Sequence, residues 1–325
     1  MKIQVVGAGS WGLALARLLS NNGHEVRLWA RLEDKPEELA ETRRSPFYLP
    51  DMLLPEDIVV STEIDPDARM AVLAVPSHAM RSVVSELRFS DATIRVNVAK
   101  GIENESLLRM SEVITVMSGP VPVVTLSGPS HAEEVSRDKP ASLVVAGEDE
   151  QARETVQDVF MAPIFRVYTS QDIVGVELGG ALKNVIAIAA GCSDGLELGD
   201  NARAALITRG LAEIARLGDA MGADRLTFAG LSGMGDLIAT CDSTHSRNRT
   251  VGVGIGQGKK LDEILGGMHM VAEGVKTAKS AHALSHKRGI EMPITEQVYK
   301  VLFEDEEPRH AIAALMTRDA KPERH

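Results

Sequence analysis

The chain has 325 residues, which is long enough for two domains with separate hydrophobic cores. Its formal net charge of −11 argues against a nucleic-acid partner, whose binding surface is basic, but allows a local cationic pocket for a small anion. Two cysteines, Cys192 and Cys241, suggest no disulfide framework and fit a reducing cytoplasm. The N-terminus enters a strand at once, and no apolar run approaches the roughly 20 residues of a membrane span. We therefore expect a cytoplasmic protein with neither a signal peptide nor a membrane-inserted segment.

A glycine-rich turn follows the first predicted strand, residues 3–6. Residues 7–12 read GAGSWG, and a helical pattern and a second strand at residues 25–30 come after them. Within such a strand–helix–strand unit, Gly7, Gly9 and Gly12 let the backbone approach a pyrophosphate, which the helix N-terminus attracts. The alternative is a tight structural turn, but the context favours a dinucleotide-binding site.

The end of the second strand bears on the choice of dinucleotide. A site that prefers NAD usually has an acidic residue there, which binds the ribose 2′-hydroxyl. This chain has Arg31 instead, which could pair with a 2′-phosphate and so indicates NADPH. Glu33 and Asp34 lie slightly further on and could weaken that preference. The alternative for Arg31 is a solvated surface charge.

Strands and helices alternate through the first half of the chain. Further strands are predicted at residues 70–75, 93–98, 123–126, 142–146 and 165–169, with a helix at about 149–160. This alternation predicts an α/β domain of the Rossmann type over residues 1–171, with a mostly parallel, doubly wound sheet.

Ligands bind such sheets at the carboxyl ends of the strands, where this chain places Gly9, Pro76, Lys100 and Gly128. Lys100 is a candidate for contacting an anion, and a surface lysine is the alternative. The hydroxyl of Ser130 either faces the substrate or caps the following helix.

The second half of the chain, residues 172–325, lacks a strand pattern and is predicted to be an all-α domain. Its first helix is expected between Asp172, a plausible N-cap, and Gly191, a plausible C-terminal stop. One face of this helix holds Lys183 among very small residues, which leaves room for something small or flat beside the amine. The alternative is that the glycines allow close helix contact and Lys183 extends to solvent.

Two polar motifs follow that helix. A glycine-rich turn puts Asp236 at the start of a helix, with Thr240 one turn later on the same face. The carboxylate either caps that helix or holds a cationic Lys183 in place. Residues 243–249 read STHSRNR, and in so acidic a chain we interpret this cluster as a phosphate site rather than a solvated face. Residues 317–325 are expected to form a polar, frayed tail.

These motifs together resemble the NAD(P)-dependent glycerol-3-phosphate dehydrogenases of the bacterial, cytoplasmic type. The resemblance runs from residue 2 to about residue 304. It rests on GAGSWGLALA (7–16), SGPSHA (127–132), ELGGALKNV (177–185), NARAALITRG (201–210), GLSGMGDL (230–237) and SRNR (246–249). The departures are small: His131 stands where the family often has phenylalanine, and Arg31 stands at a variable position.

The resemblance implies an activity and a set of catalytic and binding residues. The activity is the reversible reduction of dihydroxyacetone phosphate to sn-glycerol 3-phosphate with NADH or NADPH, which supplies the backbone of membrane phospholipids. Lys183 is implied as the proton acceptor, with Lys100 and Asp236 beside it, and a homodimer is expected. The implied cofactor-binding residues are Gly7, Gly9, Ser10, Trp11, Gly12, Arg31, Lys100, Ala132, Arg247, Val271 and Glu273. The implied substrate-binding residues are Lys100, Gly128, Ser130, Lys183, Asp236, Ser246, Arg247 and Asn248.

The proton chemistry of this set fits the reaction. Reduction of a ketone develops negative charge on the carbonyl oxygen, which a positioned acid must neutralise. An ordinary lysine pKa of about 10.4 makes Lys183 a ready donor but a poor base at pH 7. A neighbouring cation such as Lys100 would lower that pKa, and Asp236 would oppose the change.

Two other hypotheses remain open at this point. The first is a related two-domain dehydrogenase for a hydroxy acid or a sugar acid, because the SRNR cluster could also bind a carboxylate. The second is a module that binds NADPH without turnover. The combination of Lys100, Lys183 and Asp236 argues against the second hypothesis.

Overall fold

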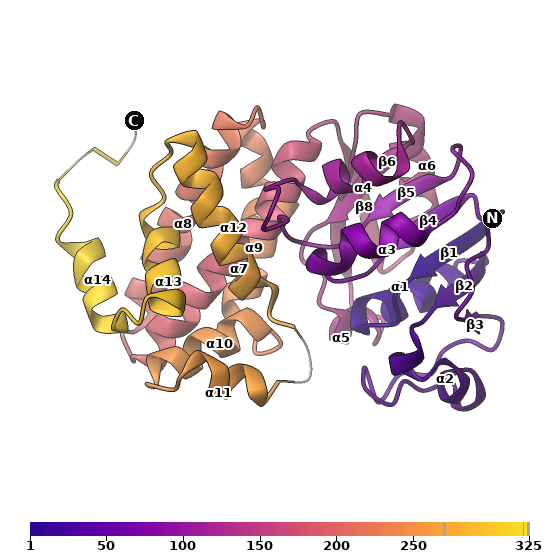
Figure 1. Cartoon of the computed structure of the whole chain (residues 1–325), viewed down its shortest axis with the longest axis horizontal. Coiled ribbons are helices and arrows are strands. Elements are labelled where there is room, and N and C mark those ends of the chain that lie inside the picture. Colours follow the sequence, from indigo (N-terminus) through magenta and orange to yellow (C-terminus); the bar gives the residue numbers. More distant parts are fainter. Residues whose placement is uncertain (269–270, 321, 324–325) are drawn as a thin grey trace.

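The computed structural model describes residues 1–268, 271–320 and 322–323 of the chain. A strand-rich half and a helical half lie side by side in it (Figure 1). One eight-stranded sheet has the order β3-β2-β1-β4-β5-β6-β7-β8. Its strands are β1 (Lys2–Val6), β2 (Glu25–Trp29), β3 (Val59–Ser61), β4 (Met70–Leu73), β5 (Ile94–Asn97), β6 (Val123–Ser127), β7 (Ala141–Ala146) and β8 (Phe165–Ser170). Only β6 and β7 pair antiparallel among these strands, so the predicted doubly wound, mostly parallel sheet is confirmed.

Helices cover both faces of this sheet, because its inner strands are apolar on both sides. Val5 belongs to one buried cluster, which includes Leu13 of α1. The next residue, Val6, belongs to a second cluster with Met80 of α3 and Val113 of α4. Successive side chains of a strand point to opposite faces, so the two clusters lie on opposite sides of the sheet. The helices of this half are α1 (Ser10–Asn21), α2 (Pro36–Thr42), α3 (Met80–Glu86), α4 (Met110–Ser118), α5 (Ala132–Val135) and α6 (Glu150–Phe160).

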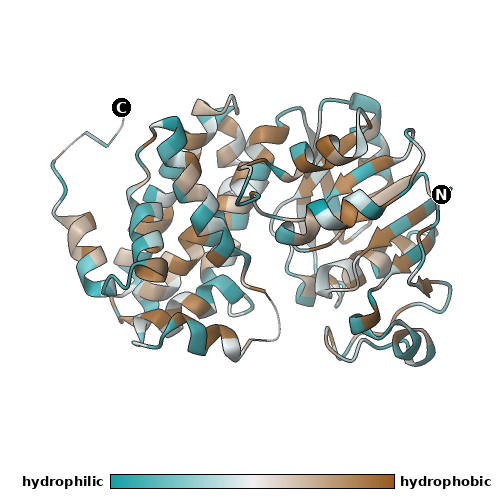
Figure 2. Ribbon diagram, viewed as in Figure 1, coloured by the Kyte–Doolittle hydropathy of each residue, from teal (hydrophilic) through white to brown (hydrophobic). Residues whose placement is uncertain are grey.

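The second half is helical, as predicted. Its helices are α7 (Ile173–Gly195), α8 (Asp200–Ala220), α9 (Asp236–Asp242), α10 (Arg247–Gly256), α11 (Leu261–Gly266), α12 (Glu273–Arg288), α13 (Pro293–Phe303) and α14 (Pro308–Met316). Helix α7 lies at the centre and packs against α8, α9, α10, α12 and α13. Figure 2 shows apolar residues on the helix faces that point into this half. Residues 321, 324 and 325 of the predicted tail lie outside the described residues.

Helix α7 begins where the sequence predicts and ends later. The Asp172 carboxylate caps it by accepting a hydrogen bond from the Gly175 amide at 2.8 Å. The predicted stop at Gly191 is wrong, because the helix continues to Gly195. A Cβ atom on Gly191 would lie 2.1 Å from the Arg249 carbonyl oxygen, so this glycine serves the close approach of α10 and not helix termination.

The same helix is long and apolar enough to cross a membrane by length and composition alone, contrary to the expectation that no apolar run approaches the length of a membrane span. Its most apolar window is 83% buried inside the protein, so these side chains form the core of the helical half.

The space that the sequence predicted beside Lys183 on this helix is partly filled. A Cβ atom on Gly180 would lie 2.7 Å from the Ser127 hydroxyl oxygen and 3.6 Å from Cγ of Lys100.

Candidate active site

A cleft of about 480 Å³ lies between the carboxyl ends of the strands and the helical half. Its walls come from the loops after β1, β4 and β5, from α7, and from the first turns of α9 and α10. Almost every predicted site residue lines this cleft. The two that do not are Gly12 and Gly128.

Two lysines and one aspartate form the polar centre of the cleft. The Asp236 carboxylate accepts from Lys183 Nζ at 2.5 Å and from Lys100 Nζ at 2.6 Å, one lysine on each oxygen. Lys183 Nζ also donates to the Thr240 hydroxyl at 2.6 Å, and Lys100 Nζ donates to the Gly128 carbonyl at 3.0 Å. Of the two roles considered for Asp236, the structure has it pairing with Lys183. Gly128 acts through its carbonyl group, which orients Lys100.

Burial and neighbouring charges change the proton affinities of these groups. Burial lowers the pKa of Lys183 to about 7; Lys100 adds to this effect and Asp236 opposes it. Burial alone would raise the pKa of Asp236, but the ammonium groups of Lys100 and Lys183 outweigh it and lower that pKa. Asp236 is therefore ionised at pH 7, while Lys183 exchanges a proton near pH 7.

The glycine-rich turn has the shape that a pyrophosphate needs. A Cβ atom on Gly9 would meet no atom of the part of the chain that the structure describes within 4 Å, so the backbone is open to the cleft at this point. A Cβ atom on Gly12 would collide with the Gly7 carbonyl oxygen, so Gly12 is needed for the tight turn itself. Helix α1 begins at Ser10 and presents its N-terminus at the same place. Trp11 and Ala132 line the adjoining wall. These residues fit a bound dinucleotide.

Arg31 lies at the rim of this part of the cleft and is already paired. Its guanidinium donates to both carboxylate oxygens of Asp34, at 3.1 and 3.0 Å. The hydrogen bond to Asp34 raises the pKa of Arg31. Asp34 thus partly neutralises the cation that could meet a 2′-phosphate.

The SRNR cluster divides between the cleft and the protein interior. Ser246 caps α10 by accepting from the Arg249 amide, and Arg247 donates to the Val271 carbonyl at 3.0 Å. Asn248 is held between Asn184, to which it donates at 2.9 Å, and the Gly274 amide, from which it accepts at 2.9 Å. Those contacts fix its amide at the cleft wall.

Arg249 is not part of the cleft, although it belongs to the same motif. Its guanidinium pairs with Asp194 of α7 at 2.6 Å. The cluster therefore supplies one guanidinium to the cleft, from Arg247, where the sequence suggested two.

Glu273 joins the two halves of the molecule at the cleft. Its carboxylate accepts from the Ser77 amide at 3.2 Å and from the Ser77 hydroxyl at 2.5 Å. Sequence reasoning placed Glu273 near the cofactor but missed Ser77, whose only signal is its position directly after Pro76 at a strand end.

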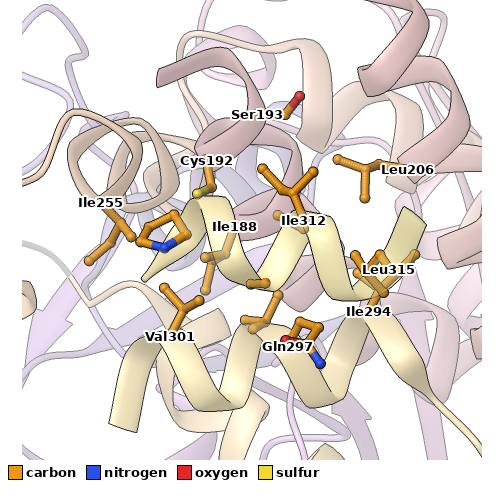
Figure 3. Close-up of a pocket in the computed structure, with 14 residues that line it drawn as sticks. Ile188, Cys192, Ser193, Leu206, Ile255, Ile294, Gln297, Val301, Ile312 and Leu315 are labelled. Carbon is orange, nitrogen blue, oxygen red and sulfur yellow. The ribbon is translucent and has the colours of Figure 1, made fainter. Parts of the chain in front are cut away.

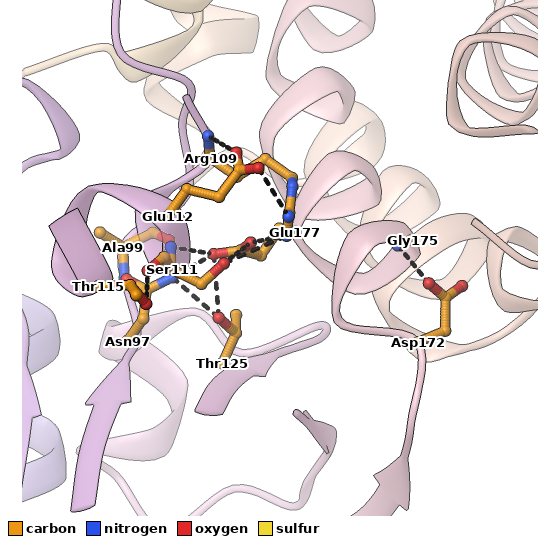
Figure 4. A network of polar contacts seen from close by, with 10 residues as sticks. All are labelled: Asn97, Ala99, Arg109, Ser111, Glu112, Thr115, Thr125, Asp172, Gly175 and Glu177. Atoms are coloured by element: carbon orange, nitrogen blue, oxygen red, sulfur yellow. Dashed lines mark hydrogen bonds and ion pairs between the residues drawn. The ribbon is translucent and has the colours of Figure 1, made fainter. Parts of the chain in front are cut away.

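A second link between the halves, also missed from the sequence, is the buried carboxylate of Glu177 on α7 (Figure 4). It accepts from Arg109 at 2.7 Å, from the Ser111 amide and hydroxyl at 2.8 and 2.6 Å, and from Asn97 and Thr125 at 3.2 and 3.1 Å. These partners lie on β5, β6 and the start of α4, so the network fixes α7, and with it Lys183, against the sheet.

His131 brings an imidazole to the cleft beside the lysines. Its ring lies 6.1 Å from that of His245, and its Nε2 atom lies 3.4 Å from the Ala239 carbonyl oxygen. Burial lowers the pKa of His131; the Ala239 carbonyl opposes this effect, and Lys183 and Lys100 add to it, so the ring is neutral at pH 7.

The helical half contains a second, much smaller pocket of about 50 Å³ beneath α14 (Figure 3). Its lining is almost entirely apolar, and includes Ile188, Leu206 and Leu315. Neither its volume nor its chemistry suits a charged metabolite, so the larger cleft is the candidate active site.

Comparison with known proteins identifies the family. A family model for the N-terminus of NAD-dependent glycerol-3-phosphate dehydrogenase matches residues 2–153, and a model for its C-terminus matches residues 172–313. The chain belongs to the NAD-dependent glycerol-3-phosphate dehydrogenase family. As a member of that family it is an NAD(P)-dependent oxidoreductase, with a Rossmann-type half and a helical half.

Individual relatives agree with the family models. A glycerol-3-phosphate dehydrogenase [NAD(P)+] of Pelotomaculum thermopropionicum is 54% identical over 325 residues, covering 98% of this chain and 93% of the relative. The crystal structure of glycerol-3-phosphate dehydrogenase from Coxiella burnetii superposes with a TM-score of 0.94 at 38% identity, covering 98% of this chain and 99% of that one. A ketopantoate reductase from Ralstonia eutropha shares the fold alone. It is 15% identical and superposes with a TM-score of 0.61, covering 96% of this chain and 100% of that one.

Proposed function

We propose that the cleft interconverts dihydroxyacetone phosphate and sn-glycerol 3-phosphate, with Lys183 as the proton donor and acceptor. The observation that carries this proposal is the buried Lys183–Asp236–Lys100 group beside a glycine turn that suits a dinucleotide. When bound, the nicotinamide cofactor supplies or accepts the hydride. The chain would hold that cofactor with Gly7, Gly9, Ser10, Trp11, Gly12, Arg31, Lys100, Ala132, Arg247, Val271 and Glu273.

Lys183 handles the proton of the reacting oxygen in this proposal. In the direction of reduction, its ammonium donates a proton from Nζ to the substrate oxygen; in the reverse direction, the neutral amine accepts it. Asp236 orients that amine at 2.5 Å, and Lys100 keeps a positive charge beside the oxygen. A pKa of about 7 allows Lys183 to act in both directions at neutral pH.

The phosphate of the substrate gives orientation and takes no part in the chemistry. We assign it to Arg247, Asn248 and the first turn of α10, where a guanidinium and a helix N-terminus suit an anion. Ser130 and Ser246 complete the substrate site, and Gly128 contributes to it by orienting Lys100. Binding energy at the phosphate then positions the reacting carbon beside Lys183.

Arg31 favours NADPH, and the Asp34 carboxylate reduces that preference, so both cofactors are used. The ratio of the kcat/KM values for NADPH and NADH measures this preference directly.

The proposal also divides the chain into two domains, residues 1–171 and residues 172–325. Limited proteolysis can check this boundary.

The product of the reduction, a glycerol phosphate, would serve as a backbone for phospholipids. We place the enzyme in the cytoplasm, as expected from its cysteine content, and as a homodimer. Cell fractionation and light scattering on the purified protein would reveal a different location or oligomeric state.

The proposal is tested by the Lys183→Ala variant, with Lys139→Ala as a matched control on the protein surface. We expect Lys183→Ala to reduce kcat for dihydroxyacetone phosphate at least a hundredfold while leaving NADPH binding, followed by nicotinamide fluorescence, nearly unchanged. Lys139→Ala should behave as wild type, because its side chain is exposed. A Lys183→Ala variant that keeps roughly a tenth or more of wild-type kcat would refute the assignment.

A further inference from the structure

Two histidines and one glutamate converge between α12 and α13, outside the cleft. His282 and His286 lie one turn apart on α12, and Glu296 lies on α13, which packs alongside (Figure 1). The Nε2 atoms of His282 and His286 lie 2.9 and 3.1 Å from the same carboxylate oxygen of Glu296. All three ligand-type atoms fall within 4.8 Å of one another.

Local structure preorganises this cluster. Residues four apart share one face of a helix, so both imidazoles project from the same side of α12. Gly289 ends α12 in the left-handed conformation, with φ 65°, and lets the chain return as α13. The ring of Tyr299 stacks on His282 with centroids 3.9 Å apart and an angle of 6° between the planes. That contact fixes the orientation of the first imidazole.

We infer that His282, His286 and Glu296 form a binding site for a divalent transition-metal ion, of which Zn²⁺ fits best. Two imidazole nitrogens and a carboxylate oxygen are a common ligand set for zinc. Bonds of about 2.0–2.2 Å in a tetrahedron place the ligand atoms roughly 3.3–3.6 Å apart. The two His–Glu separations of 2.9 and 3.1 Å need to widen by roughly 0.2–0.7 Å to reach this spacing, and the two histidine nitrogens lie within 4.8 Å of each other. The His286 side chain is 63% exposed, so the ion can enter and water can take the fourth position.

A neighbouring cation limits the affinity of this site. Lys300 Nζ lies 3.3 Å from Oε1 of Glu296, the oxygen that does not face the histidines. It competes for the carboxylate and repels a metal ion. Removing its charge should therefore strengthen metal binding, whereas removing a ligand should weaken it.

An ion at this position would join α12 to α13. A preformed site is absent from the unfolded chain, so binding stabilises the folded protein in proportion to the affinity. Helix α12 also begins at Glu273, which contacts Ser77 across the cleft, so the ion would hold one wall of the active site. The metal site itself does not depend on the proposed catalytic function.

The experiment is a titration of the full-length protein, first freed of metals with a chelator, with ZnCl₂ in a calorimeter. We expect the His286→Ala variant to lose at least tenfold in zinc affinity and Lys300→Gln to gain a few-fold. His310→Ala is the control, because it removes an exposed histidine that has glutamates beside it and, among the described residues, belongs to no group of metal-ligating side chains. Zinc should raise the melting temperature of the wild type and of His310→Ala, but not of His286→Ala.

Glu296→Gln provides a second ligand variant in case His286→Ala folds poorly, and it too should lose zinc affinity. The inference is overturned if the dissociation constant of the wild-type protein for zinc exceeds about 1 mM, because such binding is too weak for a preformed three-ligand site. It is equally overturned if both ligand variants bind zinc within roughly twofold of wild type, because the ion would then lie elsewhere, for instance in the cleft.

Discussion

Burial determines the proton affinity of Lys183. Its pKa falls to about 7 because the ammonium is desolvated, although Asp236 lies 2.5 Å away. The sequence placed Lys183, Lys100 and Asp236 as candidates and gave the sign of each neighbour's effect on the lysine pKa. It could not give the net result, because the degree of burial depends on how α7, α9 and the loop after β5 come together.

The pH dependence of the two reaction directions follows from this pKa. Below its pKa Lys183 is a proton donor, and above it a proton acceptor. We predict that kcat/KM for glycerol 3-phosphate oxidation rises through about pH 7 and then levels off, while kcat/KM for dihydroxyacetone phosphate reduction falls over the same range. Steady-state kinetics from pH 5.5 to about pH 10 measure both curves. An oxidation rate that keeps rising beyond roughly pH 9.5 would mean that Lys183 retains the proton affinity of an ordinary lysine.

Helix α7 shows what a local sequence pattern can and cannot predict. Its start at Asp172 was predicted, because an N-cap side chain bonds to its own helix. Its end was not, because a glycine that stops a helix looks the same in sequence as a glycine that admits a neighbouring helix. The edge strand β3 was missed for a related reason: with three residues, none fully buried, it has no apolar alternation to detect.

The close contact of Gly191 with α10 predicts how a larger residue at this position changes the stability of the protein. An added Cβ atom would press on the Arg249 carbonyl of α10, and two packed helix backbones cannot yield easily. We expect Gly191→Ala to lower the free energy of unfolding by roughly 1–3 kcal/mol, measured by urea denaturation. The control is Gly266→Ala at the end of α11, where an added Cβ atom meets none of the described residues within 4 Å. Equal effects of the two substitutions would contradict the packing role of Gly191.

The whole molecule depends on polar links between its two halves. The buried carboxylate of Glu177 bonds to β5, β6 and the start of α4, and Glu273 bonds to Ser77. The sequence predicted both halves and most of the cleft residues. It could not predict these links, because partners such as Glu177 and Asn97 lie 80 positions apart in the chain and follow no local pattern.

The Glu177 network gives a prediction for global stability. Glu177→Gln removes the buried carboxylate that pairs with Arg109, and among the described residues it leaves the guanidinium only the partly exposed Glu112 as a charged partner at 3.1 Å. We expect a loss of about 3–5 kcal/mol in the free energy of unfolding, and partial recovery in the double variant Arg109→Met/Glu177→Gln. Urea denaturation measures both, with the exposed Glu154→Gln as control. No recovery in the double variant would show that the charge pair is not the source of the loss.

The reaction in the cleft depends on both halves of the molecule, because each half contributes residues to the cleft walls. The most direct measurement follows absorbance at the nicotinamide band when the purified enzyme is mixed with dihydroxyacetone phosphate and either NADH or NADPH. We predict rapid oxidation of both cofactors, with the larger kcat/KM for NADPH. If both cofactors bind but neither is oxidised, while a hydroxy-acid precursor such as a 2-keto acid is reduced, the phosphate assignment at Arg247 and Asn248 is wrong.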